Sequence, residues 1–182
     1  KDWGREGKKG GITVSGGEPM LQMPFVTELF ELAHRKGVHT TLDTAGQPYR
    51  EDAEYQKAFE RMMAATDLVM LDLKAMDAQL HRRVTGLDNA NILAMARKLS
   101  DMGKPMWIRH VLVPGLTDGE DDLRQMAAFI QTLQTVERVE ILPYHTLGLS
   151  KWQRLGIDYP LEGVPTPTKE QVAKAEAILN GK

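Results

Sequence analysis

The stretch GITVSGGEP, Gly11–Pro19, places a glycine-rich turn directly after a short apolar run. The run Ile12–Ser15 has the composition of a β-strand. The two glycines permit a tight turn and a close approach of the backbone to a ligand. An amphipathic helix is expected next, from about Pro24 to Gly37, because apolar residues recur there at helical spacing. The stretch therefore predicts a strand–turn–helix unit.

The same alternation of a short apolar run and an amphipathic helix continues along the chain. The further predicted strands are Val38–Asp43, Asp67–Leu73, Met106–Val113 and Arg138–Leu142. The further predicted helices are Glu51–Ala65, a short one near Asp77–Val84, and a longer one that carries Ile92, Met95, Ala96 and Leu99 on one face and stops at Gly103. Two more follow: a helix with a capping box of Thr117 and Glu120, and a last helix capped by Thr168 and Gln171 that runs to about Leu179. Strands that alternate with helices indicate βαβ units, right-handed crossovers and a parallel sheet.

Two α/β architectures fit this pattern, a doubly wound sheet and a barrel. No G-x-G-x-x-G fingerprint follows any predicted strand, which weakens the dinucleotide-binding sheet. Polar residues follow every predicted strand, and in barrels the catalytic groups gather at the carboxyl ends of several strands. We therefore expect residues 1–182 to form a single α/β domain with about five parallel strands, arranged as a TIM-like (β/α) barrel or open barrel.

The composition excludes several classes of protein. The chain has 182 residues, is 42% hydrophobic and carries a formal charge of −2, which gives no reason to expect nucleic acid or a membrane as a partner. It contains no cysteine, so these residues form no disulfide, thiolate nucleophile or thiolate-held metal site. The polar opening Lys1–Gly10 has no initiator Met, which is expected of a piece of a longer protein. Nothing in the sequence points outside the cytoplasm.

The first three strand ends carry acidic and basic side chains. Glu18 is suited to accept hydrogen bonds from a ligand ammonium, although a plain βα turn is an equal alternative. Asp43 could hold a cation or a ligand hydroxyl, but a turn or capping Asp is the commoner role. Asp72 and Lys74 lie two apart and point to the same face, where they either pair with each other or serve a ligand.

The last two strand ends carry Arg109, His110 and His145. Neighbouring residues on a strand face opposite ways, so one of Arg109 and His110 is expected to point inward. An inward Arg109 would be either an anion clamp or a member of an ion pair. His145 could donate to a ligand hydroxyl, but a loop histidine bonded to backbone is the commoner case. Polar groups at all five strand ends favour one shared site over five unrelated turns.

These motifs, in this order, resemble a known family. SGGEP after a strand resembles the Gly-Gly-Glu motif of radical S-adenosylmethionine enzymes. The set GGITVSGGEPMLQ, TTLDTAG, TDLVMLDLK, WIRHVLVPGLTD and VEILPYHTLGLSKW resembles the glycyl-radical-enzyme activases. The likeness runs from Gly10 to the last helix. It implies the family's partial barrel of six βα units, with the first unit missing here.

The resemblance also implies a cofactor site. Its residues would be Gly16, Gly17, Glu18, Asp43, Asp72, Lys74, Arg109, Val111 and His145. The Gly-Gly-Glu turn would bind the methionyl ammonium of S-adenosylmethionine, Lys74 its carboxylate or ribose, and Asp72 with His145 the ribose. Arg109 would lie near the cofactor and the substrate peptide, and Val111 beside the adenine.

Two inorganic cofactors are implied as well. A monovalent cation would lie among Asp43, Thr44, Asp72 and the carbonyl of Met70. A C-x-x-x-C-x-x-C loop holds a [4Fe–4S] cluster in this family, and a chain without cysteine lacks that loop. The chain is therefore expected to be the C-terminal part of an activase, with no catalytic residue of its own and no activity alone.

The resemblance names the partners too. The intact protein would take one electron from a donor such as flavodoxin and remove a hydrogen atom from a glycine of a glycyl-radical enzyme, with pyruvate formate-lyase favoured. Another glycyl-radical enzyme remains an alternative, as does a non-catalytic domain that binds a nucleotide or a partner. A Schiff-base enzyme using Lys74 is a further rival, although the adjacent Asp72 stabilises the non-nucleophilic ammonium. The edge strand Ile12–Ser15 is expected to invite self-association.

Overall fold

A computed structural model describes residues 10–181, which form one parallel sheet flanked by helices. The strands follow chain order across the sheet: β1 (Gly11–Val14), β2 (His39–Thr44), β3 (Leu68–Asp72), β4 (Met106–Leu112) and β5 (Val136–Pro143). The α-helices are α1 (Met23–His34), α2 (Ala53–Ala64), α3 (Ala78–Thr85), α4 (Ala90–Asp101), α5 (Glu120–Gln131), α6 (Leu149–Leu155) and α7 (Lys169–Leu179). Two short 3₁₀ helices, η1 (Pro19–Gln22) and η2 (Thr146–Gly148), follow the first and last strands.

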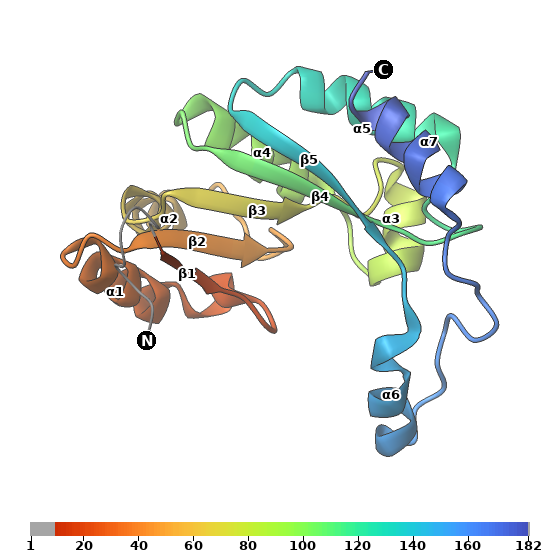
Figure 1. The fold of residues 1–182 in the computed structure, drawn as a ribbon. Helices are drawn as coiled ribbons and strands as arrows, with labels where there is room; N and C mark the ends of the chain where they lie inside the picture. The colour runs from red at the N-terminus through yellow and green to blue at the C-terminus, as the bar shows by residue number, and fades with distance from the viewer. Residues whose placement is uncertain (1–9, 182) are drawn as a thin grey trace.

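The sheet is curved, and the long helices cover its outer face, as in part of a barrel wall (Figure 1). Strand β4 shows the two faces in its burial, which alternates residue by residue. Ile108 and His110 point to the helix layer and are fully buried, whereas Trp107 and Arg109 point to the inner face and are half-buried. The predicted five-stranded, parallel α/β fold is confirmed.

Strand register brings the polar residues of the inner face to two successive levels of the sheet. Asp43 lies opposite Met70, and Asp72 lies opposite Arg109, which in turn lies opposite Glu140. In-register residues of parallel strands share a face. The carboxyl ends of β2, β3, β4 and β5 therefore present charged side chains toward the same space.

The core lies between the sheet and the helices. Its largest fully buried side chains include Phe30, Phe59, Met62, Met63, Leu71, Met95, Leu99 and Ile108. Burial of such side chains contributes about 1.5–3 kcal/mol each, which makes this layer the main source of stability. No helix among residues 10–181 is long and apolar enough to cross a membrane.

Of the two capping boxes predicted from the sequence, one is confirmed and the other is wrong. Thr168 and Gln171 form the predicted capping box of α7. The box predicted from Thr117 and Glu120 is wrong, because Gly119 is the N-cap of α5 and makes no side-chain cap bond. The hydroxyl of Thr117 instead bonds the turn after β4, where backbone groups would otherwise be buried without partners. Helix α6 was not predicted, because seven residues are too few to establish a helical period.

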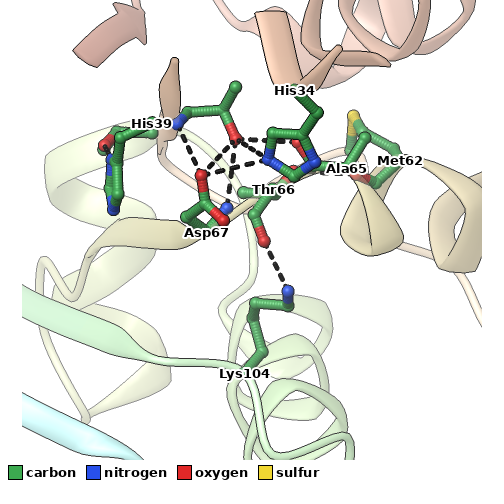
Figure 2. A network of polar contacts seen from close by, with 9 residues as sticks. His34, His39, Met62, Ala65, Thr66, Asp67 and Lys104 are labelled. Carbon is green, nitrogen blue, oxygen red and sulfur yellow. Dashed lines mark hydrogen bonds and ion pairs between the residues drawn. The ribbon is translucent and has the colours of Figure 1, made fainter. Parts of the chain in front are cut away.

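A second polar network lies at the amino ends of the strands, opposite the charged end (Figure 2). Asp67 accepts a hydrogen bond from the backbone N–H of Thr40 at 2.8 Å and lies 3.0 Å from Nε2 of His34. Lys104 donates to the carbonyl of Thr66. Burial lowers the pKa of the Lys104 ammonium, although the charge of Asp67 opposes this shift. This end of a barrel serves stability rather than chemistry.

Candidate functional site

The turn after β1 requires glycine for its backbone conformation. Gly16 has φ +85° and Gly17 has φ +50°, in the region that L-residues rarely adopt. No heavy atom lies within 4 Å of where a Cβ would stand at either position. The constraint is therefore conformational rather than steric, and the turn keeps open space around its backbone.

Glu18 ties this turn to the end of β2. Its Oε1 accepts from the backbone N–H of Met20 at 3.0 Å and from the hydroxyl of Thr44 at 2.6 Å. Its Oε2 accepts from the backbone N–H of Ala45 at 3.0 Å. A carboxylate offers about four acceptor positions, so one position on Oε2 remains for a further donor. Glu18 is thus rigidly placed and still able to accept a ligand ammonium.

Four charged side chains form what we call the charged rim: Asp43, Asp72, Lys74 and Arg109. Lys74 donates to Asp72 Oδ2 at 2.6 Å, and Arg109 Nε donates to Asp72 Oδ1 at 3.0 Å. Arg109 also donates to Asp43. These side chains are only 15–25% exposed, so their charges are poorly screened by water.

The rim is electrostatically balanced, with two carboxylates and two cations. Burial opposes the charged form of the Arg109 guanidinium, but the carboxylates of Asp72 and Asp43 outweigh it and raise the pKa of Arg109. Of Arg109 and His110, one of which was expected to point inward, Arg109 is the inward one, and it takes the ion-paired form. The ion pair of Lys74 with Asp72 also disfavours Lys74 as a Schiff-base amine.

The guanidinium of Arg109 contacts both carboxylates of the predicted cation site. The hydroxyl of Thr44, a third predicted ligand, donates to Glu18 and accepts from the backbone N–H of Gly46. Within residues 10–181, no three His, Asp or Glu side chains come together as a candidate metal site. A cation between Asp43 and Asp72 would have to compete with Arg109.

The remaining predicted site residues, Val111 and His145, also lie at the carboxyl ends of the strands. Val111 is two residues beyond Arg109 on the same half-buried face of β4. His145 follows β5 and is exposed, and its Nδ1 accepts from the backbone N–H of Leu147 at 3.4 Å. No hydrogen bond in the described part of the chain joins His145 to the charged rim. Its predicted role toward the ribose stays a prediction.

Sequence reasoning missed two buried side chains that hold the loop carrying Lys74. Asp122 of α5 accepts from the backbone N–H groups of Met76 and Asp77, at 3.0 and 2.7 Å. Asn89 donates to the carbonyls of Ala75 and Met76, at 3.1 and 2.8 Å. In the sequence, both residues look like ordinary residues of a helix start. Only the tertiary fold shows that they bind the loop that carries Lys74.

Comparison with known proteins agrees with this architecture. Residues 1–130 match the Radical SAM superfamily. The chain is 55% identical over 174 residues to the pyruvate formate-lyase-activating enzyme of Streptococcus mutans, covering 96% of this chain and 66% of that protein. It is 51% identical over 173 residues to the enzyme of the same name from Staphylococcus aureus, covering 95% and 69%. The family match over most of the chain identifies this open parallel sheet as that of a radical SAM protein.

A solved structure extends the likeness. The crystal structure of a domain of pyruvate-formate lyase-activating enzyme from Bacteroides vulgatus superposes with a TM-score of 0.76 at 25% identity, covering 94% of each chain. The chain therefore belongs to the radical SAM superfamily and, within it, to the family of the pyruvate formate-lyase-activating enzymes. It spans about two thirds of the length of the curated relatives it matches, 66% and 69%.

Proposed function

We propose that the chain is the cofactor-binding part of an activase that generates a glycyl radical on pyruvate formate-lyase. The observation that carries this function is the convergence of Glu18 and the charged rim at the carboxyl ends of adjacent strands. Identity of 55% to a pyruvate formate-lyase-activating enzyme supports the choice of partner. Flavodoxin is the class of electron donor that such a protein would use.

The donor set fits S-adenosylmethionine. The free acceptor position of Glu18 suits the ammonium of the methionyl group. Lys74 and Arg109 offer donors for its carboxylate, and Asp72 offers an acceptor for ribose hydroxyls. Val111 offers an apolar contact for the adenine. A monovalent cation would bind here only if the cofactor first draws Arg109 away from Asp43 or Asp72.

Held by Glu18, Asp72 and Lys74, S-adenosylmethionine would supply, with a [4Fe–4S] cluster and one electron from the donor, the chemistry that removes a hydrogen atom from the partner's glycine. The residues of this chain orient the cofactor and keep its charged groups in place while water is excluded. The chain has no cysteine, so thiolate ligands for the cluster would come from residues outside it. The chain alone should therefore form no 5′-deoxyadenosine, even after supply of iron and sulfide.

A chimera tests this function. The part of the Streptococcus mutans relative that this chain does not cover, joined to this chain, should allow it to bind a cluster, cleave S-adenosylmethionine and raise a glycyl-radical EPR signal on pyruvate formate-lyase. The variant Asp72→Ala in the same chimera should keep the cluster absorbance but lose most of the product. A chimera that binds the full cluster and yields no 5′-deoxyadenosine would contradict the function. Product from the chain alone would contradict the dependence on an outside cluster.

A further inference from the structure

His110 occupies an unusual position for a histidine. It lies on the outer face of β4 and is 0% exposed. Its Nδ1 is 2.9 Å from the carbonyl oxygen of Leu73, and its Nε2 is 2.9 Å from the carbonyl oxygen of Thr117. Carbonyl oxygens only accept hydrogen bonds. Both ring nitrogens must therefore donate, which only the doubly protonated, positively charged ring can do.

The two carbonyls belong to two different loops at the carboxyl ends of the strands. Leu73 stands between Asp72 and Lys74, so its carbonyl belongs to the backbone that carries the charged rim. Thr117 closes the turn between β4 and α5, where its hydroxyl donates to the carbonyl of Val111 at 2.6 Å. His110 thus bridges the β3–α3 loop and the β4–α5 turn, an arrangement that we call the His110 bridge.

A buried carboxylate holds the same β3–α3 loop from another element. Asp122 of α5 is the one buried carboxylate among residues 10–181, and it binds the same β3–α3 loop a few residues farther on. The other charged or titratable groups on neighbouring elements include Lys74 on that loop, His81 on α3 and Asp118 in the β4–α5 turn. The flanking strands carry Asp72 and Glu140, and the first turn of α5 carries Glu120 and Asp121. Burial lowers the pKa of His81, so this residue adds no competing charge at neutral pH.

We propose that His110 is a positioning residue whose doubly protonated ring locks the β3–α3 loop to the β4–α5 turn and so fixes Lys74 and Asp72 for the cofactor. Two charge-assisted hydrogen bonds hold the loops in one geometry before any ligand binds. Loss of either ring proton leaves a nitrogen lone pair facing a carbonyl oxygen, and one loop is released. The cofactor step rests on the function proposed above, whereas the bridge itself does not.

The bridge is tested on the ligand-free chain by NMR. Long-range ¹H–¹⁵N spectra of ¹⁵N-histidine protein report how many ring nitrogens carry protons, and His110→Gln identifies the signal among the five histidines. At neutral pH, both nitrogens of His110 should be protonated, and the signal of the exposed His39 serves as the comparison. As the pH rises and His110 loses one proton, the amide signals of residues 73–77 should shift. A single neutral tautomer of His110 at neutral pH would overturn the bridge.

Its role in cofactor positioning is tested by binding. S-adenosylmethionine affinity is measured by calorimetry across pH for the wild-type chain, His110→Gln and the control His39→Gln. The affinity of His110→Gln should be about tenfold lower at neutral pH, as expected for loss of one charged hydrogen bond, and should lack the alkaline decline of the other two. The ionisation of the ligand is common to all three proteins, so the difference reports the ring.

The possible outcomes distinguish a failure of the positioning role of His110 from a failure of the proposed function. An unchanged affinity and pH profile in folded His110→Gln would overturn the positioning role. If this variant does not fold, the wild-type titration decides, because affinity must fall over the same pH interval in which the NMR signal of His110 changes. No binding by the wild-type chain at any pH would instead contradict the proposed function, and the NMR result would still stand.

Discussion

Glu18 does structural work as well as offering an acceptor to a ligand. Replacing it by alanine leaves the hydroxyl of Thr44 and the backbone N–H groups of Met20 and Ala45 without their acceptor. We expect Glu18→Ala to lower the free energy of unfolding by about 1–3 kcal/mol, measured by urea denaturation. Glu28→Ala, an exposed change on α1, should leave it within about 0.5 kcal/mol. Equal midpoints for the two variants would contradict the structural role.

Asp67 gives the stability of the chain a dependence on acid pH. Burial opposes ionisation of its carboxyl, but the hydrogen bonds from Thr40 and His34 outweigh burial and lower its pKa below the ordinary value of 3.8. A carboxyl with a depressed pKa stabilises the fold above its unfolded pKa, and this contribution is lost as the pH falls through the folded pKa. Urea midpoints should therefore fall below about pH 4, and Asp67→Asn should flatten this part of the profile. An identical pH profile in Asp67→Asn would exclude the carboxyl as its source.

At the scale of elements, Gly46 controls how the end of β2 packs against α4. Its φ is +73°, and a Cβ there would lie 3.0 Å from Leu71 and 3.2 Å from Met95. Gly37 has a similar φ of +66° with no atom within 4 Å, so it is a matched control. Both alanine variants should lose about 1–2 kcal/mol to backbone strain, and Gly46→Ala about 1–3 kcal/mol more to overpacking. Thermal unfolding measures the stability loss of each variant. Equal losses would contradict the overpacking, because they would mean that α4 moves away from the new Cβ without loss of stability.

Much of the element layout could be predicted from the sequence, because strand and helix periods are local. Asp52 and Asp77 cap α2 and α3 at the predicted helix starts. The prediction failed where a local signal competes with tertiary contacts, as at Thr117, whose hydroxyl bonds strand-end backbone rather than a helix start. It also failed for α6, whose seven residues carry no period.

At the scale of the whole molecule, the sheet has an edge at β1, which pairs only with β2 among the described strands. The nearby η1 and α1 expose Leu21, Phe25 and Leu32, at 74%, 62% and 50%. An open edge beside apolar side chains favours pairing between chains. Light scattering should show association that rises with concentration and weakens in Thr13→Lys, but not in Gln153→Lys on α6. A monomer at all concentrations would contradict this expectation.

The general position of the candidate site could be predicted because it follows from the parallel arrangement of the whole sheet. Parallel strands bring their carboxyl ends to one edge, so polar residues after each strand could be expected to meet. Sequence could not show that Arg109 would neutralise Asp43 and Asp72 together, since that pairing depends on register across three strands. Nor could the sequence show that Asn89, His110 and Asp122 hold the backbone next to the charged rim. Their burial sets them apart from other polar residues, and burial cannot be read from composition.

The central claim is that the carboxyl ends of these strands form a binding wall for S-adenosylmethionine. The most direct measurement is a titration of the ¹⁵N-labelled chain with S-adenosylmethionine, up to several millimolar because the cluster anchor is absent, and followed by amide shifts. The account predicts shifts concentrated at residues 16–18, 43–46, 72–74 and 109–111, with affinity lowered by Asp72→Ala. No shifts at saturating cofactor, or shifts elsewhere while these residues stay unchanged, would contradict it.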